Sequence, residues 1–487
     1  MKKWHAFGLG VSLVLSAWAA QAQSYRGTVK STGKPTMQST APEPASGGGT
    51  RCRSELSPEA LDRAASKAAV LELFQQDPPA VPQDPLTQLK MIAKEALGRS
   101  QAIGASRWLS DAARYDYQQT DAGRFPTVSV SASTSTGRNE VGDLTTSQGR
   151  TSSLGISAGA NLYDGGRLKG FIQWRKDLME ASKQSARAAQ EAVVLEAITT
   201  VLERNRYRNQ AQVYQQHARK MACLVEALEA IVAEDRGRAS ELVQVRKNQA
   251  QAELSRDSAV AQSRQIDLKL KRLLGDQFVV SENLSGPFTQ TPDLGELHRL
   301  LERSPEALQL KLQADAQEDM ARAMNDGAGP QVNWSVSRSK GFSKVANSNG
   351  WQAGITLSYT LFDSGAEKAG IKAALARAEA SRAQYADFLA NRTERISSVH
   401  DSARTAFDRA KRYVDILRDS DLLRNFTFQQ WSQLGRRSLF DLMSAEGDHF
   451  SLRIAYVNSL YDGYIANAQL RSMGGGVTDW LQIEGWR

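Results

Sequence analysis

Apolar and polar residues alternate in four short segments of the chain, two in each half. Strict alternation places apolar side chains on one face of an extended strand and polar side chains on the other. The pattern therefore predicts four strands, over residues 127–135, 153–163, 331–338 and 351–362. The polar stretches 137–152 and 339–350 are predicted to be the loops within each strand pair.

Each strand pair leads into the same turn and then into a long helical pattern. The turns read Tyr163-Asp164-Gly165-Gly166 and Phe362-Asp363-Ser364-Gly365. Good helix formers then fill residues 167–234 and 366–433. Apolar residues recur in them at alternating intervals of three and four, which is typical of a coiled coil. In the second half these are Ile396, Val399, Ala403, Ala406, Ala410, Tyr413 and Leu417.

Each long helix meets a short break that contains glycine, and a second helical pattern follows. The breaks are Asp235-Arg236-Gly237-Arg238 and Gln433-Leu434-Gly435-Arg436. Because glycine tolerates a positive φ, the pattern predicts helical hairpins with their second helices over 240–274 and 438–470. A single helix interrupted by an ordinary glycine is the alternative.

The two halves of the chain follow one plan. Val128 corresponds to Val332 and Leu162 to Leu361, an offset of about 200 residues that exceeds any solenoid period. We therefore predict a duplicated α/β module, with a first repeat at 84–286, a second repeat at 287–470 and a C-terminal tail at 471–487.

The N-terminal segment predicts export. Lys2 and Lys3 precede an apolar run that ends near Ala20, and small residues follow at the expected cleavage position. We expect residues 1–22 to be a signal peptide and 23–83 to be a flexible Pro/Ser/Gly-rich leader with a short helix. An uncleaved anchor is the alternative. The rest of the sequence has no apolar run long enough for a membrane-spanning helix.

Composition and motifs argue against catalysis and nucleic-acid binding. The net charge of +8 arises from interspersed charges of both signs, as on a solvated helical surface. The five histidines are scattered without metal-ligand spacing, and we find no nucleophile motif or phosphate-binding loop. The two cysteines, Cys52 and Cys223, are expected to be unpaired. We predict no enzymatic activity and no cofactor.

The predicted strands have the length that a tilted strand needs to cross a bilayer, about 9 to 11 residues. Phe125, Tyr163, Trp351 and Phe362 fall at strand ends, where interfacial aromatic residues belong. A sheet in lipid has to close on itself, and closure needs about eight strands. Several chains would therefore pool their strands. A soluble four-stranded sheet is the alternative.

In the order of these elements the chain resembles the TolC-like outer-membrane channel proteins. The likeness extends from about Asp84 to Leu470 and rests on the duplicated plan, the Leu-aromatic-Asp-x-Gly turns and the glycine-containing reversals. It implies an α+β membrane protein with four transmembrane β-strands and long coiled-coil helical hairpins in each chain. Three chains would form a homotrimer, with a 12-stranded β-barrel that continues into a periplasmic α-barrel in the cell outer membrane.

The resemblance assigns the two helix reversals to adaptor docking. The family docks its adaptor protein at hairpin tips with a hydrophobic-Gly-small motif. Here the corresponding residues are Arg236, Gly237 and Arg238 at the first tip, and Leu434, Gly435 and Arg436 at the second. Arg236 departs from the apolar residue of the family pattern, so docking is less secure at the first tip.

The resemblance also places a periplasmic gate just beyond the second tip. The family has an arginine there, then an acidic residue four positions later and another three positions after that. Arg437 and Asp441 match the first two positions, whereas Ser444 replaces the second acid and Val243 stands at the equivalent first-half position. An ordinary surface carboxylate is the alternative for Asp441.

This architecture implies a passive exit duct of a tripartite export machine. Its expected partners are a periplasmic adaptor (membrane fusion) protein, an inner-membrane ABC exporter or proton-driven pump, and outer-membrane lipid. Gln23, rather than a lipid-acceptor cysteine, follows the predicted cleavage site, which favours type I protein secretion. The outer-membrane component of a multidrug efflux pump is the alternative. A periplasmic adaptor or coiled-coil scaffold would have one central hairpin instead of two.

Overall fold

The computed structural model describes residues 84–141, 144–276, 284–343, 347–433 and 435–483. The predicted signal peptide and leader, residues 1–83, lie outside the described residues, as do Leu434 and the last four residues of the tail. Cys52 lies outside them too. Cys223 is disulfide-bonded, so the expectation of an unpaired thiol is wrong for this residue.

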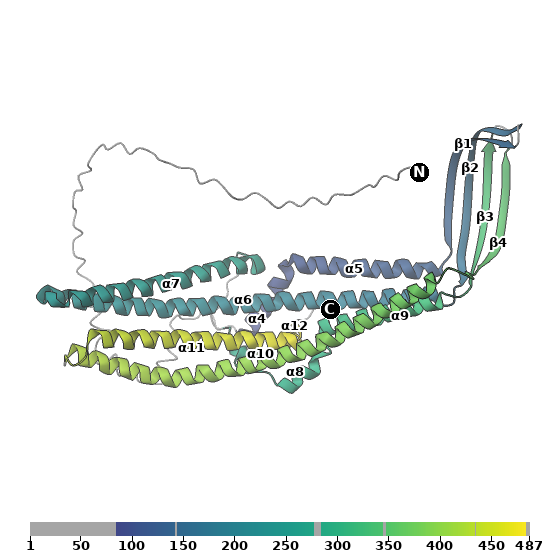
Figure 1. Ribbon diagram of the computed structural model, residues 1–487. Coiled ribbons are helices and arrows are strands. Elements are labelled where there is room, and N and C mark those ends of the chain that lie inside the picture. The colour runs from purple at the N-terminus through teal and green to yellow at the C-terminus, as the bar shows by residue number, and fades with distance from the viewer. Residues whose placement is uncertain (1–83, 142–143, 277–283, 344–346, 434, 484–487) are drawn as a thin grey trace, which may run out of the picture. The chain divides into compact units, whose positions relative to one another are not determined.

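The first half of the described chain runs from two helices through a strand pair into a helical hairpin (Figure 1). Helix α4 begins at Pro85, directly after Asp84, since proline at the first helical position sacrifices no helix hydrogen bond. The elements are α4 (Pro85–Arg99), α5 (Gln101–Asp121), η1 (Ala122–Arg124), β1 (Thr127–Val141), β2 (Leu144–Tyr163), α6 (Arg167–Glu234), η2 (Arg236–Arg238) and α7 (Ala239–Leu274).

The second half repeats this order. Ser304 caps its first long helix, accepting a hydrogen bond of 3.3 Å from Ala307 N, and Pro305 takes the first helical position. The elements are η3 (Gly286–Phe288), α8 (Leu294–Leu301), α9 (Pro305–Asp326), β3 (Gln331–Ser343), β4 (Ser348–Ser358), α10 (Ala366–Ser432), α11 (Leu439–Met473) and α12 (Val477–Trp480).

The four strands form one antiparallel sheet in the order β1-β2-β3-β4, so β2 and β3 join the two halves. The register aligns apolar residues across all four strands: Val128, Ala158, Val336 and Ala353 form one row. The opposite face carries small polar residues and glycine, with Ser129 and Ser157 hydrogen-bonded to each other at 2.8 Å between their Oγ atoms. One face is therefore apolar and exposed, the other small and polar.

The strands differ in length from those predicted. The sequence predicted loops at 137–152 and 339–350, but β1 and β2 continue to Val141 and from Leu144, and β3 continues to Ser343. Ladder hydrogen bonds join backbone groups, so they persist where side-chain alternation has ended. Strand β4 ends at Ser358 instead of residue 362 because Ser358 pairs with Gln331, and Pro330 has no N–H to extend the ladder.

The aspartate of each turn caps the long helix that follows. Asp164 accepts hydrogen bonds from Gly166 N at 3.0 Å and Leu168 N at 2.8 Å, and Asp363 accepts the equivalent pair from Gly365 N and Glu367 N. A Cβ on Gly165, whose φ is +70°, would lie 2.3 Å from Asp326 O. The glycine that both halves share, Gly166 and Gly365, directly precedes the long helix with a φ of +102° and +87°, so Asp-x-Gly supplies both the cap and a left-handed position.

The long helices confirm the predicted coiled-coil pattern and helical hairpins. Every residue of the predicted stripe on α10 is buried except Tyr413, which is half-buried. Helix α6 packs against α5, α7 and α9, and α10 packs against α9 and α11 (Figure 1). The largest buried cluster combines α4, α6, α7 and α11 with the C-terminal α12, and includes Leu89, Ile198, Leu274, Tyr461 and Leu481.

Candidate docking tips and gate

The first reversal is a short turn closed by an aspartate. Asp235 accepts a hydrogen bond of 2.9 Å from Gly237 N, and η2 follows directly. Arg238 is held by Glu241, with 2.7 Å between Nη2 and Oε2, whereas Arg236 is exposed. Gly237 does not have a positive φ, so the expected conformational reason for glycine is wrong at this tip. A Cβ there would instead meet Asp235 Oδ1 at 3.0 Å.

The second reversal does need glycine. Gly435 has a φ of +60°, in the left-handed region, and its position is open, with no atom within 4 Å of a Cβ placed on it. The turn is closed by a hydrogen bond of 3.1 Å from Arg436 N to Gln430 O. Leu434, the remaining predicted docking residue of this tip, lies outside the described residues.

The two predicted gate residues lie together at the start of α11. Arg437 Nη1 is 3.9 Å from Asp441 Oδ2, and both side chains are about half exposed. Arg437 also donates from Nε to Gln430 Oε1 at 3.2 Å. Asp441 has a second role, because it forms a capping box with Ser438, each side chain accepting from the other's backbone N–H at 3.2 Å.

Large exposed apolar side chains lie beside both tips, outside the six residues that the family resemblance assigns to docking. Val243 in the first turns of α7 is 66% exposed, and Phe440 in the first turn of α11 is 70% exposed. Phe440 lies outside the buried stripe of α11, which contains Leu439, Leu442 and Met443. In the sequence, an aromatic residue at position 440 that does not fit the spacing of the buried stripe could have indicated this exposed apolar side chain.

Apolar packing and buried charge join the two hairpins close to their tips. Met221, Leu224 and Leu228 of α6 pack against Leu439 and Leu442 of α11. One turn further along α11, Glu446 is almost fully buried, and its carboxylate lies 3.4 Å from Arg424 of α10 and 3.9 Å from Lys220 of α6. A buried carboxylate needs such partners, so Glu446 ties α11 to both long helices.

The buried cluster continues through His449 and Arg453, one and two turns beyond Glu446. Burial, together with the nearby Arg424 and Arg453, lowers the pKa of His449 to about 3. Burial also lowers the pKa of Arg453 to about 10. His449 therefore stays neutral at ordinary pH, and its ring packs edge-on against Phe450.

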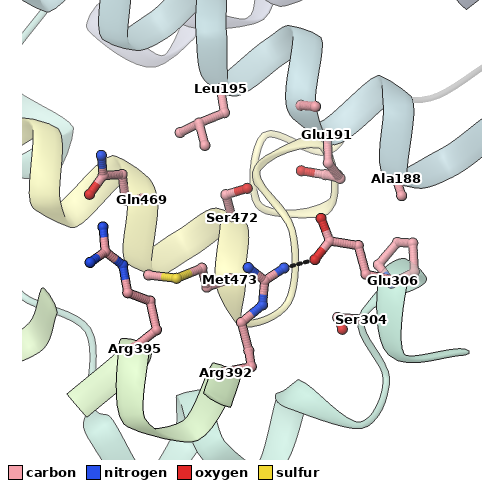
Figure 2. Close-up of a pocket in the computed structure, with 12 residues that line it drawn as sticks. Ala188, Glu191, Leu195, Ser304, Glu306, Arg392, Arg395, Gln469, Ser472 and Met473 are labelled. Atoms are coloured by element: carbon pink, nitrogen blue, oxygen red, sulfur yellow. Dashed lines mark ion pairs between the residues drawn. The ribbon is translucent and has the colours of Figure 1, made fainter. Parts of the chain in front are cut away.

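A pocket lies between α6, α9, α10 and α11, away from the tips (Figure 2). Arg392 of α10 pairs there with Glu306 of α9. Glu191 of α6 also borders the pocket and accepts hydrogen bonds from Val477 N at 2.6 Å and Thr478 N at 3.1 Å. Burial raises the pKa of Glu191 to about 7 despite these hydrogen bonds. The side chain thus anchors the C-terminal α12 to α6.

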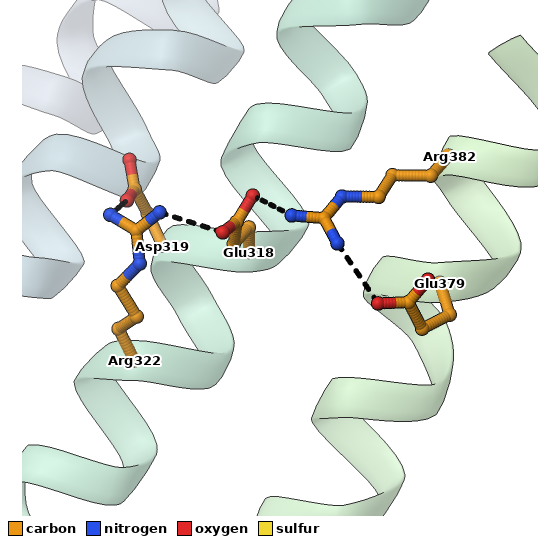
Figure 3. A network of polar contacts seen from close by, with 5 residues as sticks. All are labelled: Glu318, Asp319, Arg322, Glu379 and Arg382. Carbon is orange, nitrogen blue, oxygen red and sulfur yellow. Dashed lines mark hydrogen bonds and ion pairs between the residues drawn. The ribbon is translucent and has the colours of Figure 1, made fainter.

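Nearer the sheet, a chain of charges connects α9 to α10 (Figure 3). Arg382 of α10 bridges Glu379 on its own helix and Glu318 of α9, and Glu318 also receives Arg322 at 2.8 Å. Asp319 adjoins Arg322, but burial and the neighbouring Asp177 of α6 raise the pKa of Asp319 to about 6. The polar contacts therefore extend from α10 through α9 to α6.

The described ranges show neither a metal-binding cluster nor a membrane-spanning helix. They contain no group of three or more His, Cys, Asp or Glu side chains suited to a metal ion. None of their helices combines the length and apolar character required to span a bilayer.

The family model of the outer membrane efflux protein matches residues 92–276 and 297–476. The chain belongs to this family. Its members are outer-membrane channels rather than enzymes, which confirms the expected localisation, with a large periplasmic helical portion, and the expected lack of enzymatic activity. No curated protein sequence matches this chain significantly.

Solved channels share the fold at low sequence identity. CusC is 18% identical, with 83% of this chain and 96% of that chain covered and a TM-score of 0.73. VceC from Vibrio cholerae is 16% identical, with 80% and 96% covered and a TM-score of 0.70. CmeC from Campylobacter jejuni is 14% identical, with 80% and 86% covered and a TM-score of 0.69. The predicted fold class, four strands joined to long helical hairpins, is confirmed.

Proposed function

We propose that three copies of this outer membrane efflux protein form the exit duct of an export machine. The observation that carries the proposal is the sheet, which has one apolar exposed face and two edges, β1 and β4, without a partner strand among the described residues. Backbone groups at a sheet edge cannot remain unpaired in lipid. Pairing β4 of one chain with β1 of the next would close a barrel of twelve strands, with the small polar face lining its interior.

The assembly is tested by native mass spectrometry of protein extracted from outer membranes in mild detergent. A three-chain species that conducts ions in planar bilayers is expected. A stable monomer that stays soluble without detergent would contradict the proposal, because its apolar sheet face would then have no lipid to cover it.

The two tips are the proposed docking surface for a periplasmic adaptor protein. Val243 and Phe440 would supply apolar contact area there, and the open position of Gly435 would allow close approach of a partner helix. Arg437 and Asp441 lie immediately beside the second tip. In a three-fold assembly they would form a charged ring at the periplasmic entrance, which is the proposed gate. An inner-membrane pump would supply the energy.

The cargo has two candidates. The absence of a lipid-acceptor cysteine at the predicted cleavage site supports type I protein secretion through an ABC exporter, whereas the family description supports a role in an efflux pump. Deletion of the gene, followed by complementation, separates them. Loss of one abundant protein from the culture medium with unchanged drug and metal resistance supports secretion. The reverse result supports efflux.

A further inference from the structure

Two basic side chains interrupt the apolar face of the sheet. Arg338 and Lys340 of β3 lie on this face, two and four residues beyond Val336. The register places Arg338 between Ile156 and Trp351, and Lys340 beside Leu154. Both are exposed, and neither has an acidic partner among the described side chains. A cation on a lipid-facing surface raises the free energy of the inserted protein unless it reaches water or an anion. An anionic ligand at these two positions would remove that cost.

The distance of Arg338 and Lys340 from the periplasmic end of β3 shows which side of the membrane they are near. Strand β3 leaves the helices at Gln331 and runs toward its hairpin with β4. At about 3.4 Å per residue, Lys340 lies roughly 27 Å beyond Val332, or about 20 Å along the membrane normal for a strand tilted by about 40°. The apolar band of an outer-membrane barrel is about 25 Å tall. Because the helices are periplasmic, both cations lie in the outer-leaflet half.

The geometry of Lys340 shows which way its charge points. Lys340 Nζ lies 5.3 Å from the ring centroid of Phe342, which is two residues closer to the hairpin end of the strand. The ammonium group is therefore directed away from the apolar rows, as long basic side chains do near a membrane boundary.

A third cation follows on the neighbouring strand. Arg150 of β2 lies on the same face as Leu154, four residues nearer the hairpin end, and is exposed. Its Nε donates to Thr134 Oγ1 at 3.0 Å, which holds the guanidinium against the sheet. The register places Arg150 four positions beyond Lys340 and six beyond Arg338, about 14 and 20 Å along the strands, so the three cations form a series that leads from the apolar rows toward the hairpin end.

We propose that Arg150, Arg338 and Lys340 bind the phosphate groups of phosphorylated lipids in the outer leaflet. The inference rests on the proposed barrel, which makes the apolar face lipid-facing. Lipid is the expected source of phosphate because the cations adjoin exposed Ile156 and Trp351, which would contact acyl chains while the charges contact headgroups. Each chain of a trimer would carry one such site.

The test uses the purified full-length trimer in neutral detergent, titrated with bisphosphorylated lipid A and, separately, with the same lipid after removal of its phosphates. Binding is followed by native mass spectrometry. The double variant R338Q/K340Q is expected to bind the phosphorylated lipid on the order of 10- to 30-fold more weakly, given the contribution of each basic residue at a membrane surface. Wild type and variant are expected to bind the dephosphorylated lipid equally.

Lys247→Gln, at an exposed lysine of α7 far from the sheet, is the matched control and should leave binding unchanged. The proposal is overturned if R338Q/K340Q retains wild-type affinity for the phosphorylated lipid, or if it weakens both lipids alike, which would indicate packing rather than charge. Failure of the wild type to trimerise or conduct would instead refute the proposed function, so the two failures are distinguishable.

Discussion

At the residue scale, Asp441 illustrates how a local structural role can coincide with a proposed functional one. Its carboxylate completes the capping box of α11 and also lies 3.9 Å from Arg437. The first role requires only a hydrogen-bond acceptor, and the second requires negative charge. A substitution that separates acceptor from charge therefore separates the two roles.

Asp441→Asn is expected to keep the capping box but remove the charge, whereas Asp441→Ala removes the charge and the carboxylate half of the capping box, leaving Ser438 to accept from the backbone N–H of residue 441. If the ring is a gate, both variants should lose block by multivalent cations added from the periplasmic side in planar bilayers. Arg437→Ser should raise conductance several-fold, because the remaining carboxylates would repel one another. Normal cation block in Asp441→Asn would leave Asp441 with the capping role alone.

Glu191 predicts a pH dependence of stability. Its pKa is raised from 4.5 to about 7 in the folded chain, so the unfolded chain releases its proton first as pH rises. The favourable contribution is therefore fully present below pH 4.5 and is lost as pH rises through about 7, a change on the order of 3 kcal/mol at most. Glu191→Gln should flatten this slope in thermal unfolding followed by helical circular dichroism between pH 5 and 7.5.

Glu394→Gln, at an exposed position of α10, is the control for that measurement and should keep the wild-type slope. An unchanged slope in Glu191→Gln would show that other groups govern the pH response. Asp319, whose pKa is also raised, is the next candidate in that case.

At the element scale, the helical hairpins were predictable from sequence and the strand ends were not. Coiled-coil spacing and helix formers define α6 and α10 to within a residue or two, because every turn repeats the same signal. The extra length of β1 and β2 has no side-chain signal, since their outer parts are rich in Ser, Thr and Gly. The sequence also could not reveal Glu446 or Glu191 as anchors, because their partners lie far away along the chain.

The second tip provides the sharpest test at this scale. Gly435→Asn should be tolerated, because asparagine readily adopts the left-handed conformation. Gly435→Asp has nearly the same shape but adds a charge to the proposed docking surface, so it should impair export while trimer formation and membrane insertion remain normal. The measurement is cargo export in a complemented deletion strain, with Gly237→Asp examined alone and in combination. Normal export in the double aspartate variant would exclude the tips as the docking surface.

At the scale of the whole molecule, the sheet connects sequence pattern to membrane insertion. The alternation predicted which residues share a face, and the register then aligned those faces across four strands. The closure of the barrel could not be predicted from the pattern of one chain, because it depends on strands from partner chains.

Adjacent residues on opposite faces give a matched pair of variants. Ala158→Arg would place a charge on the lipid-facing side near the middle of the apolar rows, where arginine costs about 2 to 4 kcal/mol. Ser157→Arg would place the same group on the polar side. The first should reduce the amount of trimer in outer-membrane fractions, and the second should insert normally but change conductance and ion selectivity. A more severe insertion defect in Ser157→Arg would reverse the assignment of the two faces.

The pairing of β2 with β3 has a wider consequence for the assembly. The two similar halves belong to one polypeptide and their strand pairs join through β2 and β3, so a ring that would need six half-chains needs only three whole ones. Because the halves are parts of one chain, they need not have identical sequences, and their tips differ. The first tip is closed by Asp235 and has arginines on both sides of Gly237, whereas the second is closed by the left-handed turn at Gly435. Around the periplasmic mouth of the proposed trimer the two kinds of tip would alternate. The six tips would therefore have nearly sixfold symmetry in their positions but only threefold symmetry in their side chains. A docking partner could distinguish one tip from its neighbour on the ring.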